Sequence, residues 1–264
     1  MTGERRVAVV MAASRGLGRA CAEALADEGL DLVVCARGAE ALEATATELR
    51  GRGAAVITVL ADLSDADDVE RVVATAQDTY GRLDVLVVNA GGPPAGTFRE
   101  LDDAAFEAGF QLTQMSAVRA IRAAVPIMTA PHSGSRGGRI VIIGSSSVRS
   151  PIGHLVVSNT YRPGLNGLVK SLAVELAPHG ITVNMVSPGK IATDRLRSME
   201  ERVAAERATT VEEVRRGAVA RIPAGRLGEP RELGDAVAYL TSERAAYVTG
   251  QSLLVDGGMV PNLP

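Results

Sequence analysis

The segment from Val7 to Arg37 constrains the fold more than any other part of the chain. It opens with a five-residue apolar run ending at Met11, continues through a turn of small residues, and enters a helical pattern with Leu17, Cys21 and Leu25 on one face. A second apolar run follows. A strand, a turn, an amphipathic helix and another strand in this order predict the first unit of a nucleotide-binding sheet.

The turn between the first strand and the helix reads Ala12-Ala13-Ser14-Arg15-Gly16-Leu17-Gly18. Glycines allow a sharp bend and let a pyrophosphate approach the backbone N–H groups at a helix N-terminus. Two interpretations are open, a phosphate-binding turn or an ordinary loop that contains glycine. The strand before the turn and the helix after it favour the phosphate-binding turn.

Short apolar runs alternate with longer helical patterns along the rest of the chain. The predicted strands are residues 7–11, 32–36, 56–60, 85–88, 140–143, 182–186 and 252–255, and the main later helices are residues 39–50, 64–80, 102–128, 156–177 and 230–240. The helix at 64–80 opens with the capping pattern Ser64-x-x-Asp67. Seven strands without a hairpin signal predict an α/β fold with a doubly wound, seven-stranded parallel sheet. The turns after its strands are expected to converge on one ligand site.

One domain covering residues 1–264 accounts for all of these elements. Residues 190–228 are polar, charged and interrupted, with one short helix expected after the capping pair Thr210 and Glu213. We expect this segment to form a lid over the substrate.

Composition and charge exclude several classes of partner. A net charge of -3 and a pI of about 5.7, without a basic run, argue against nucleic acid. No apolar run approaches the ~18 residues of a membrane span, and residues 1–6 are too short and polar for a signal peptide. Cys21 and Cys35 lie in apolar segments, as buried thiols of a reducing compartment do, and the histidines are too scattered for a metal site. We expect a cytoplasmic protein with small-molecule ligands.

Five further segments carry motifs. They are Ala61-Asp62-Leu63, Asn89-Ala90-Gly91, Ser187-Pro188-Gly189-Lys190-Ile191-Ala192-Thr193, Arg226-Leu227-Gly228-Glu229-Pro230 and Val255-Asp256-Gly257-Gly258. With the glycine turn, they make the chain resemble the short-chain dehydrogenase/reductase family, in its 3-oxoacyl-ACP-reductase-like branch, over essentially its whole length. Met11 and Ala12 stand where the family usually has Thr and the first Gly of its turn.

The resemblance implies a Rossmann fold, a nicotinamide dinucleotide and the residues that bind it. Asp62 matches the acidic contact to adenine, and the Pro-Gly segment ending at Thr193 matches the loop that holds the nicotinamide carboxamide. The implied cofactor residues are Ala12, Ser14, Arg15, Gly16, Leu17, Gly18, Arg37, Asp62, Leu63, Asn89, Ala90, Gly91, Arg162, Pro188, Gly189, Ile191 and Thr193.

The charge after the second strand indicates which dinucleotide is bound. An NAD site has a carboxylate there to accept a hydrogen bond from the ribose 2′-OH, whereas this chain has Arg37. Arg15 adds a second cation in the turn. Two arginines suit a 2′-phosphate, so we expect NADP(H) in preference to NAD(H). The alternative is that Arg37 is a solvated residue at a helix start.

The catalytic positions depart from the family. The resemblance aligns Ser145 with the family Ser, but it aligns Ser158 with the Tyr, Arg162 with the Lys and Thr113 with the Asn. A fixed guanidinium can still hold ribose hydroxyls, whereas a serine hydroxyl is a much weaker acid than a phenol. Tyr161 lies about 60° round the helix from Ser158, so its phenol is either a displaced acid or part of helix packing.

Two further residues are candidates near the substrate. His154 precedes the helix of Ser158 and titrates near neutrality without help, so it is either a proton carrier or a solvated loop residue. Lys190 follows the expected nicotinamide site and is either a substrate contact or an exposed lid residue.

Two functions of different classes remain open. The first is an NADP(H)-dependent oxidoreductase acting on a carbonyl or alcohol, with a non-standard proton donor. The second is a cofactor-binding protein of the same fold without redox turnover, serving as a sensor, partner subunit or scaffold. The resemblance also implies a homotetramer, and small-residue helix faces at Ala117, Ala120, Ala124, Ala173 and Ala177 would permit close contact between subunits.

Overall fold

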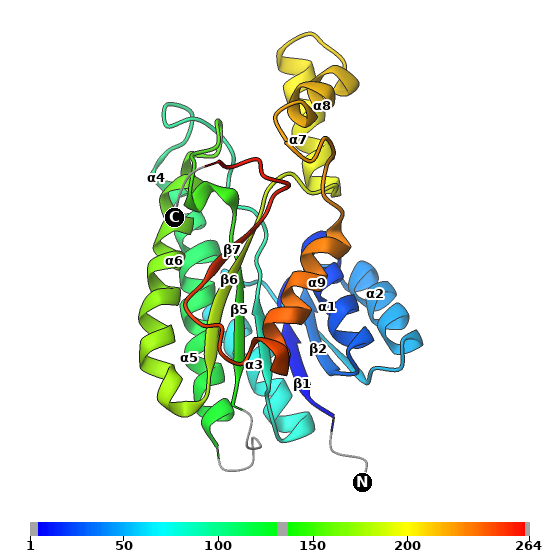
Figure 1. The fold of residues 1–264 in the computed structure, drawn as a ribbon, viewed down its shortest axis with the longest axis vertical. Helices are drawn as coiled ribbons and strands as arrows, with labels where there is room; N and C mark the ends of the chain where they lie inside the picture. The colour runs from blue at the N-terminus through cyan, green and yellow to red at the C-terminus, as the bar shows by residue number, and fades with distance from the viewer. Residues whose placement is uncertain (1–4, 131–136, 262–264) are drawn as a thin grey trace.

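Parallel strands form the centre of the molecule (Figure 1). The structure is a computed structural model that describes residues 5–130 and 137–261. Within these residues the sheet has seven strands, in the spatial order β3 (Val56–Leu60), β2 (Asp31–Ala36), β1 (Val7–Val10), β4 (Val85–Val88), β5 (Arg139–Ile143), β6 (Thr182–Pro188) and β7 (Ser252–Val255). All six pairings are parallel, which confirms the predicted doubly wound α/β sheet. The strand order reverses between β1 and β4, where such sheets bind their ligands.

Helices cover both faces of the sheet (Figure 1). One face packs against α3 (Ala66–Tyr80), α5 (Ser116–Thr129) and α6 (Val156–Leu176), and the other against α1 (Gly16–Asp27), α2 (Ala39–Gly51) and α9 (Pro230–Thr241). Successive strand residues enter opposite cores, as Val9 and Val10 do. This alternation is the pleat of a strand buried on both faces, which explains the continuous apolar runs.

The two cysteines are free and buried in different cores, as expected for structural thiols. Burial raises the pKa of Cys21 to about 12 and that of Cys35 to about 11. Neither thiol is therefore ionised near neutral pH.

The long helix predicted at 102–128 is a continuous helical run in three parts. It consists of α4 (Asp103–Phe110), a π-helical segment (Gln111–Met115) and α5. The expectation that small residues of α5 face another subunit is wrong. Ala117, Ala120 and Ala124 are fully buried in the core of their own chain, where α5 packs on α3 and the sheet.

The start of α3 also differs from the prediction. Asp65, not Ser64, caps this helix, since its carboxylate accepts a hydrogen bond from the backbone N of Asp68 (3.0 Å). The Ser64 hydroxyl instead donates to Asp62 Oδ1 (2.7 Å). Ser64 therefore stabilises the turn after β3, and the N-cap of α3 lies one residue later than predicted.

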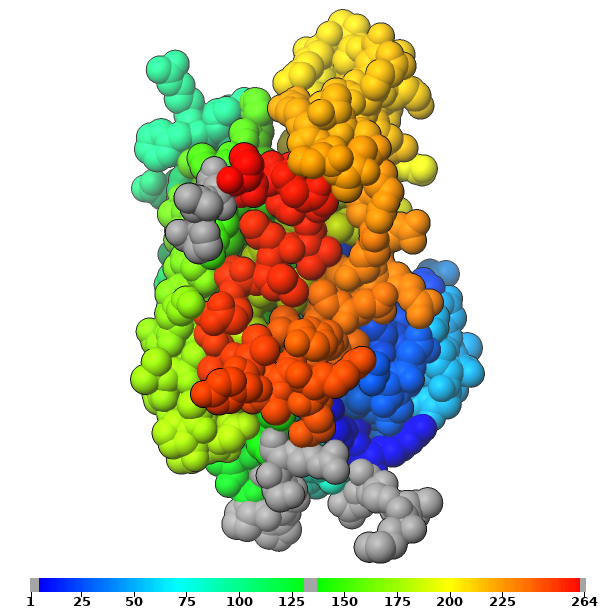
Figure 2. All heavy atoms as spheres, in the orientation of Figure 1, coloured from blue at the N-terminus to red at the C-terminus, as the bar shows by residue number. Residues whose placement is uncertain are grey.

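The segment 190–228 contains two helices, α7 (Asp194–Glu206) and α8 (Val211–Val219), where only the second was expected. They project together beyond the carboxyl end of the sheet, as the yellow and gold atoms of Figure 2 show. A buried carboxylate on α7 joins them, because Arg215 Nη2 lies 2.6 Å from Glu200 Oε2. The predicted capping box of Thr210 and Glu213 is present.

The polar N-terminal stretch 1–6 falls mainly outside the described residues, because residues 1–4 are not described. Across the described chain, no helix combines the length and the apolar character needed to cross a lipid bilayer.

Candidate active site

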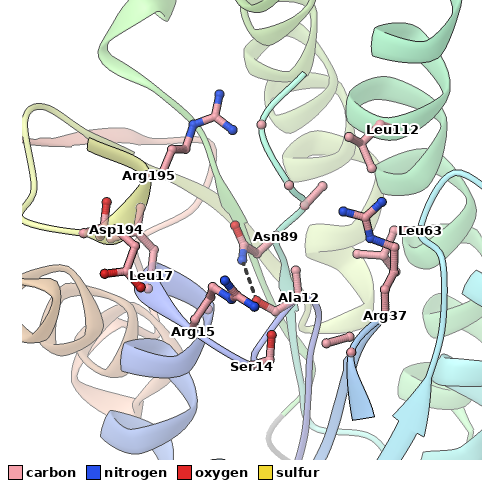
Figure 3. Close-up of a pocket in the computed structure, with 18 of the residues that line it drawn as sticks. Ala12, Ser14, Arg15, Leu17, Arg37, Leu63, Asn89, Leu112, Asp194 and Arg195 are labelled. Atoms are coloured by element: carbon pink, nitrogen blue, oxygen red, sulfur yellow. Dashed lines mark hydrogen bonds between the residues drawn. The ribbon is translucent and has the colours of Figure 1, made fainter. Parts of the chain in front are cut away.

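The carboxyl ends of β1 to β4 open into one cavity of about 570 Å³ (Figure 3). It brings together most of the expected cofactor residues. These are Ala12, Ser14, Arg15, Gly16, Leu17, Gly18, Arg37, Asp62, Leu63, Asn89, Ala90, Gly91 and Thr193. Arg162, Pro188, Gly189 and Ile191 do not line it, nor do Ser145, Ser158 and Tyr161. The convergence predicted for the strand ends thus holds for the nucleotide side of the sheet.

Close packing holds the glycine turn in shape. A Cβ at position 18 would overlap the carbonyl oxygen of Ala12 and lie 2.7 Å from Asn89 Nδ2. The Asn89 amide in turn donates to the carbonyl oxygens of Met11 (3.3 Å) and Ala12 (3.4 Å). Gly16 has φ +57°, and Ala12 adopts φ +50°, a conformation that costs an L-residue about 1 kcal/mol. The turn therefore needs Gly18, and Ala12 accepts strain in a conformation that glycine adopts more easily.

The N-terminus of α1 faces this cavity without an acceptor of its own. Arg15 is the N-cap residue, makes no side-chain capping bond, and is followed by a first turn without an acidic residue. The first backbone N–H groups of a helix need acceptors, and phosphate oxygens supply them. The turn is therefore chemically suited to a pyrophosphate.

Two exposed arginines flank the turn. Arg37 follows β2 and Arg15 precedes α1, and they lie on opposite sides of Ser14 in Figure 3. In the ranges 5–130 and 137–261 neither guanidinium has a hydrogen-bond or ion-pair partner. The pKa of Asp62 is lowered, chiefly by hydrogen bonds from the backbone and side chain of Ser64 and less by the charge of Arg37. These residues fit a dinucleotide with its adenosine end near Asp62.

On the substrate side, three serines lie near the end of β5. Ser145 Oγ accepts a hydrogen bond from the backbone N of Ser147 (3.1 Å) and caps a short 3-10 turn. Ser158, in the first turn of α6, is buried, and its Oγ lies 3.5 Å from Ser147 Oγ. Ser145 remains partly exposed, whereas Ser158 faces a neighbouring hydroxyl.

Arg162 connects α6 to the end of β5. Its Nη1 donates to the carbonyl oxygens of Ile143 and Gly144, both at 2.8 Å. Burial, and to a smaller extent the charge of Arg195, lowers the pKa of Arg162 to about 10, so the guanidinium stays charged at neutral pH. Arg162 thus positions the backbone directly before Ser145, a role that its alignment with the family Lys does not indicate.

Tyr161 packs against an aromatic ring. Its ring centroid lies 5.6 Å from that of Phe110, with the ring planes tilted by 56°. Thr113 is buried in the π-helical segment, and its hydroxyl has no hydrogen-bond partner among the described residues. π-Helical turns are frequent at functional sites.

The backbone carbonyl oxygens of the two remaining candidate residues, His154 and Lys190, accept hydrogen bonds. His154 is exposed at φ +58°, and its carbonyl oxygen accepts a hydrogen bond from Gly96 N (2.7 Å). Lys190 is half-buried, its pKa is lowered by burial, and its carbonyl oxygen accepts from Gly228 N (3.0 Å).

The cavity has seven lining residues that were absent from the expected site, namely Ala36, Gly38, Ala61, Gly92, Leu112, Asp194 and Arg195. Gly92 and Asp194 directly follow motif residues, so proximity in sequence could have identified them. Arg195 comes from the start of α7, a helix that the sequence did not predict.

The geometry agrees with comparisons to known proteins. The model of a family described as enoyl-(acyl carrier protein) reductase matches residues 11–260. The chain belongs to the short-chain dehydrogenase/reductase family. Its similarity to the 3-oxoacyl-[acyl-carrier-protein] reductase FabG of Escherichia coli is 34% identity over 98% of this chain and 99% of the relative.

Two further known proteins are similar to this chain over nearly the full length. L-rhamnose 1-dehydrogenase (NAD(P)(+)) of Azotobacter vinelandii is 36% identical over 98% of both chains. L-sorbose reductase of Gluconobacter frateurii, solved with NADPH and L-sorbose, superimposes with a TM-score of 0.92 at 31% identity over 98% of both chains. The chain therefore has the fold and branch that its motifs indicated.

Proposed function

We propose that this protein is an NADP(H)-dependent oxidoreductase that transfers hydride between nicotinamide and the carbon of a carbonyl or alcohol. The observation that carries the proposal is the cavity at the strand-order reversal, with its open helix N-terminus and two unpartnered arginines. The L-sorbose reductase, which superimposes over nearly the whole chain, was solved with NADPH, and this supports the choice of cofactor.

The residues of the substrate side have distinct tasks in this proposal. When bound, the dinucleotide supplies or accepts the hydride. Ser145 donates a hydrogen bond to the substrate oxygen, and Arg162 holds the backbone that carries Ser145. Ser158 contributes polarity but little acidity, because an aliphatic hydroxyl does not ionise near neutrality. The proton comes from Tyr161, His154 or water relayed through the site, since the phenol of the family position is replaced.

One observation favours the alternative of a cofactor-binding protein without turnover. Ser158 faces another serine and Tyr161 packs on Phe110. A sensor, partner subunit or scaffold needs the nucleotide cavity but no acid at the substrate oxygen.

A titration with NADPH and NADH, followed by nicotinamide fluorescence, tests the proposal without a known substrate. We expect NADPH to bind at least about tenfold more tightly than NADH, a difference of about 1.4 kcal/mol. If neither binds, hydride transfer is excluded. If NADPH binds but a broad carbonyl panel gives no oxidation, the alternative function is favoured.

We also propose that the protein is a cytoplasmic homo-oligomer, a tetramer by family resemblance. Exposed apolar side chains support association, namely Val174 on α6, Leu253 on the edge strand β7 and Tyr247 before it. Light scattering after size-exclusion chromatography should give about four times 27.4 kDa. A monomer at micromolar concentration would refute this assembly.

A further inference from the structure

Arg195 reaches across the cavity from the first turn of α7. Thr193 caps that helix, and Thr193 Cγ2 lies 3.8 Å from the Cβ position of Gly16, so the lid begins directly over the glycine turn. From there the guanidinium of Arg195 extends to the loop after β4, where it occupies the space of a side chain at Gly92. In Figure 3, Asn89 lies between Arg195 and Arg37. Arg195 is thus at the opposite end of the cavity from the proposed adenosine end.

No acidic group compensates this cation. In the part of the chain that the structure describes, no oxygen accepts a hydrogen bond from the Arg195 guanidinium. Asp194 lines the same cavity but forms no ion pair with it, and the buried Glu200 of the same helix is paired with Arg215. Although much of Arg195 is exposed, partial burial lowers its pKa, and Arg202 adds a smaller repulsion.

A second cation lies near Arg195. The charge of Arg195 contributes to lowering the pKa of Arg162, whose guanidinium donates only to the neutral carbonyl oxygens of Ile143 and Gly144. Arg195 also lies in the first turn of α7, where the helix dipole disfavours a positive charge. A chain with a net charge of -3 therefore places two neighbouring guanidinium groups here that have no ion-pair partner among the described residues. Positive charges without a partner destabilise the folded protein, and an anionic ligand bound beside them would offset this destabilisation.

We propose that Arg195 selects substrates that carry a carboxylate beside the reacting carbonyl group, such as oxo acids. A guanidinium presents two parallel N–H donors that match the two oxygens of a carboxylate. In the reaction, the carbonyl carbon gains a hydride from NADPH and its oxygen gains a proton, leaving an alcohol and NADP+. The carboxylate is unchanged and serves to hold the substrate. This inference rests on the proposed function and names its substrate class.

The test measures binding, so it does not depend on turnover. Calorimetric titrations of the protein saturated with NADP+ compare acetate, butanoate and 3-phenylpropanoate with their amides, which have the same shape without the charge. We expect at least one acid to bind about tenfold more tightly than its amide, and the substitution Arg195→Gln to abolish this preference. Arg197→Gln is the matched control, since Arg197 is an exposed arginine of the same helix and does not line the cavity. It should retain the preference.

A second variant tests the position of the guanidinium while keeping its charge. Gly92→Ala adds a methyl group in the space that Arg195 occupies, so the guanidinium must move and the preference for acids should fall. The inference is overturned if no acid binds more tightly than its amide, or if Arg195→Gln leaves the preference unchanged. It is also overturned if Arg195→Gln weakens NADPH binding about tenfold, because Arg195 then serves the pyrophosphate.

These outcomes are distinct from failure of the proposed function. If NADPH does not bind at all, the proposed function fails, and the same titrations of the cofactor-free protein still report whether Arg195 binds carboxylates. If NADPH binds and carbonyl compounds are reduced without regard to charge, the proposed function stands and the inference fails.

Discussion

The nucleotide cavity and the polar cluster at the end of β5, which is the proposed substrate side, depend on different parts of the chain. On the nucleotide side the binding groups are backbone N–H groups and the shape of the turn around Gly16 and Gly18. At the end of β5 the polar groups are individual side chains, namely Ser145, Ser158 and Arg162. A backbone site tolerates changes such as Ala12 in place of glycine, whereas one changed side chain removes an acid. The nucleotide side therefore depends on backbone conformation, whereas the proposed roles of Ser145, Ser158 and Arg162 each depend on the identity of one side chain.

The largest effect is expected from a substitution that disrupts the glycine turn. Gly18→Ala places a methyl group against the Ala12 carbonyl and Asn89, which should cost about 1–3 kcal/mol of stability and most of the NADPH affinity. Gly167→Ala is the control, because that position in α6 has no atom within 4 Å of the added Cβ and should gain about 0.5–1 kcal/mol. Thermal unfolding and nicotinamide fluorescence measure both. Wild-type NADPH affinity in Gly18→Ala would refute the role of this contact.

Removing one side chain on the substrate side should mainly reduce stability. Arg162→Ala leaves the carbonyl oxygens of Ile143 and Gly144 without their donor, at a cost of about 2–3 kcal/mol in urea unfolding of the cofactor-free protein. Arg162→Lys should recover part of this loss, since one ammonium can still donate. Arg197→Gln should change stability by less than about 0.5 kcal/mol. If Arg162→Ala unfolds like the wild type, Arg162 does not position the end of β5.

A smaller effect is expected from removing Arg37, the positive charge proposed to favour NADP(H) over NAD(H). Arg37→Ala should weaken NADPH binding about 30-fold, or about 2 kcal/mol, through loss of charge-assisted hydrogen bonds to the 2′-phosphate. NADH binding should change little. Arg231→Ala, on an exposed part of α9, is the control for a lost surface charge. Equal weakening of both cofactors in Arg37→Ala would contradict the assignment.

The smallest expected effect is a loss of stability at alkaline pH, caused by the two cysteines buried in the hydrophobic cores. Burial raises the pKa of Cys21 and Cys35 to about 12 and 11, above the unfolded value of about 8.5, so folding keeps both thiols neutral. The stability from these thiols is complete below pH ~8.5 and is lost as the pH rises toward their pKa values in the folded protein. Melting temperatures between pH 8 and 10.5 should therefore fall more steeply in the wild type than in Cys21→Ala/Cys35→Ala. Parallel curves would show that the thiols do not contribute.

Much of the nucleotide side could be predicted because its signals are local. The glycine turn, the Asn89-Ala90-Gly91 element and Arg37 each directly follow an apolar strand, and parallel strands bring their ends to one edge. The cap of α3 was displaced by one residue because Ser64 bonds to Asp62, a choice between two adjacent polar side chains that the pattern alone does not settle.

The substrate side was less predictable because its contacts join distant segments. The sequence placed Arg162 one turn after Ser158, but the acceptors of its guanidinium lie at the end of β5. Arg195 was missed because α7 has few buried residues, mainly Glu200 and Ala204, and so lacks an apolar stripe.

The sequence by itself determined the parallel sheet, the two helical layers and most of the residues that line the nucleotide cavity, because apolar periodicity and turn chemistry act between near neighbours. Only the tertiary structure decided that α5 buries its alanines in its own chain, that Arg162 bonds to β5, and that Arg195 lies over Gly92. The physical reason is that the direction of a side chain depends on the partners and space around it, and these come from segments far apart in the sequence.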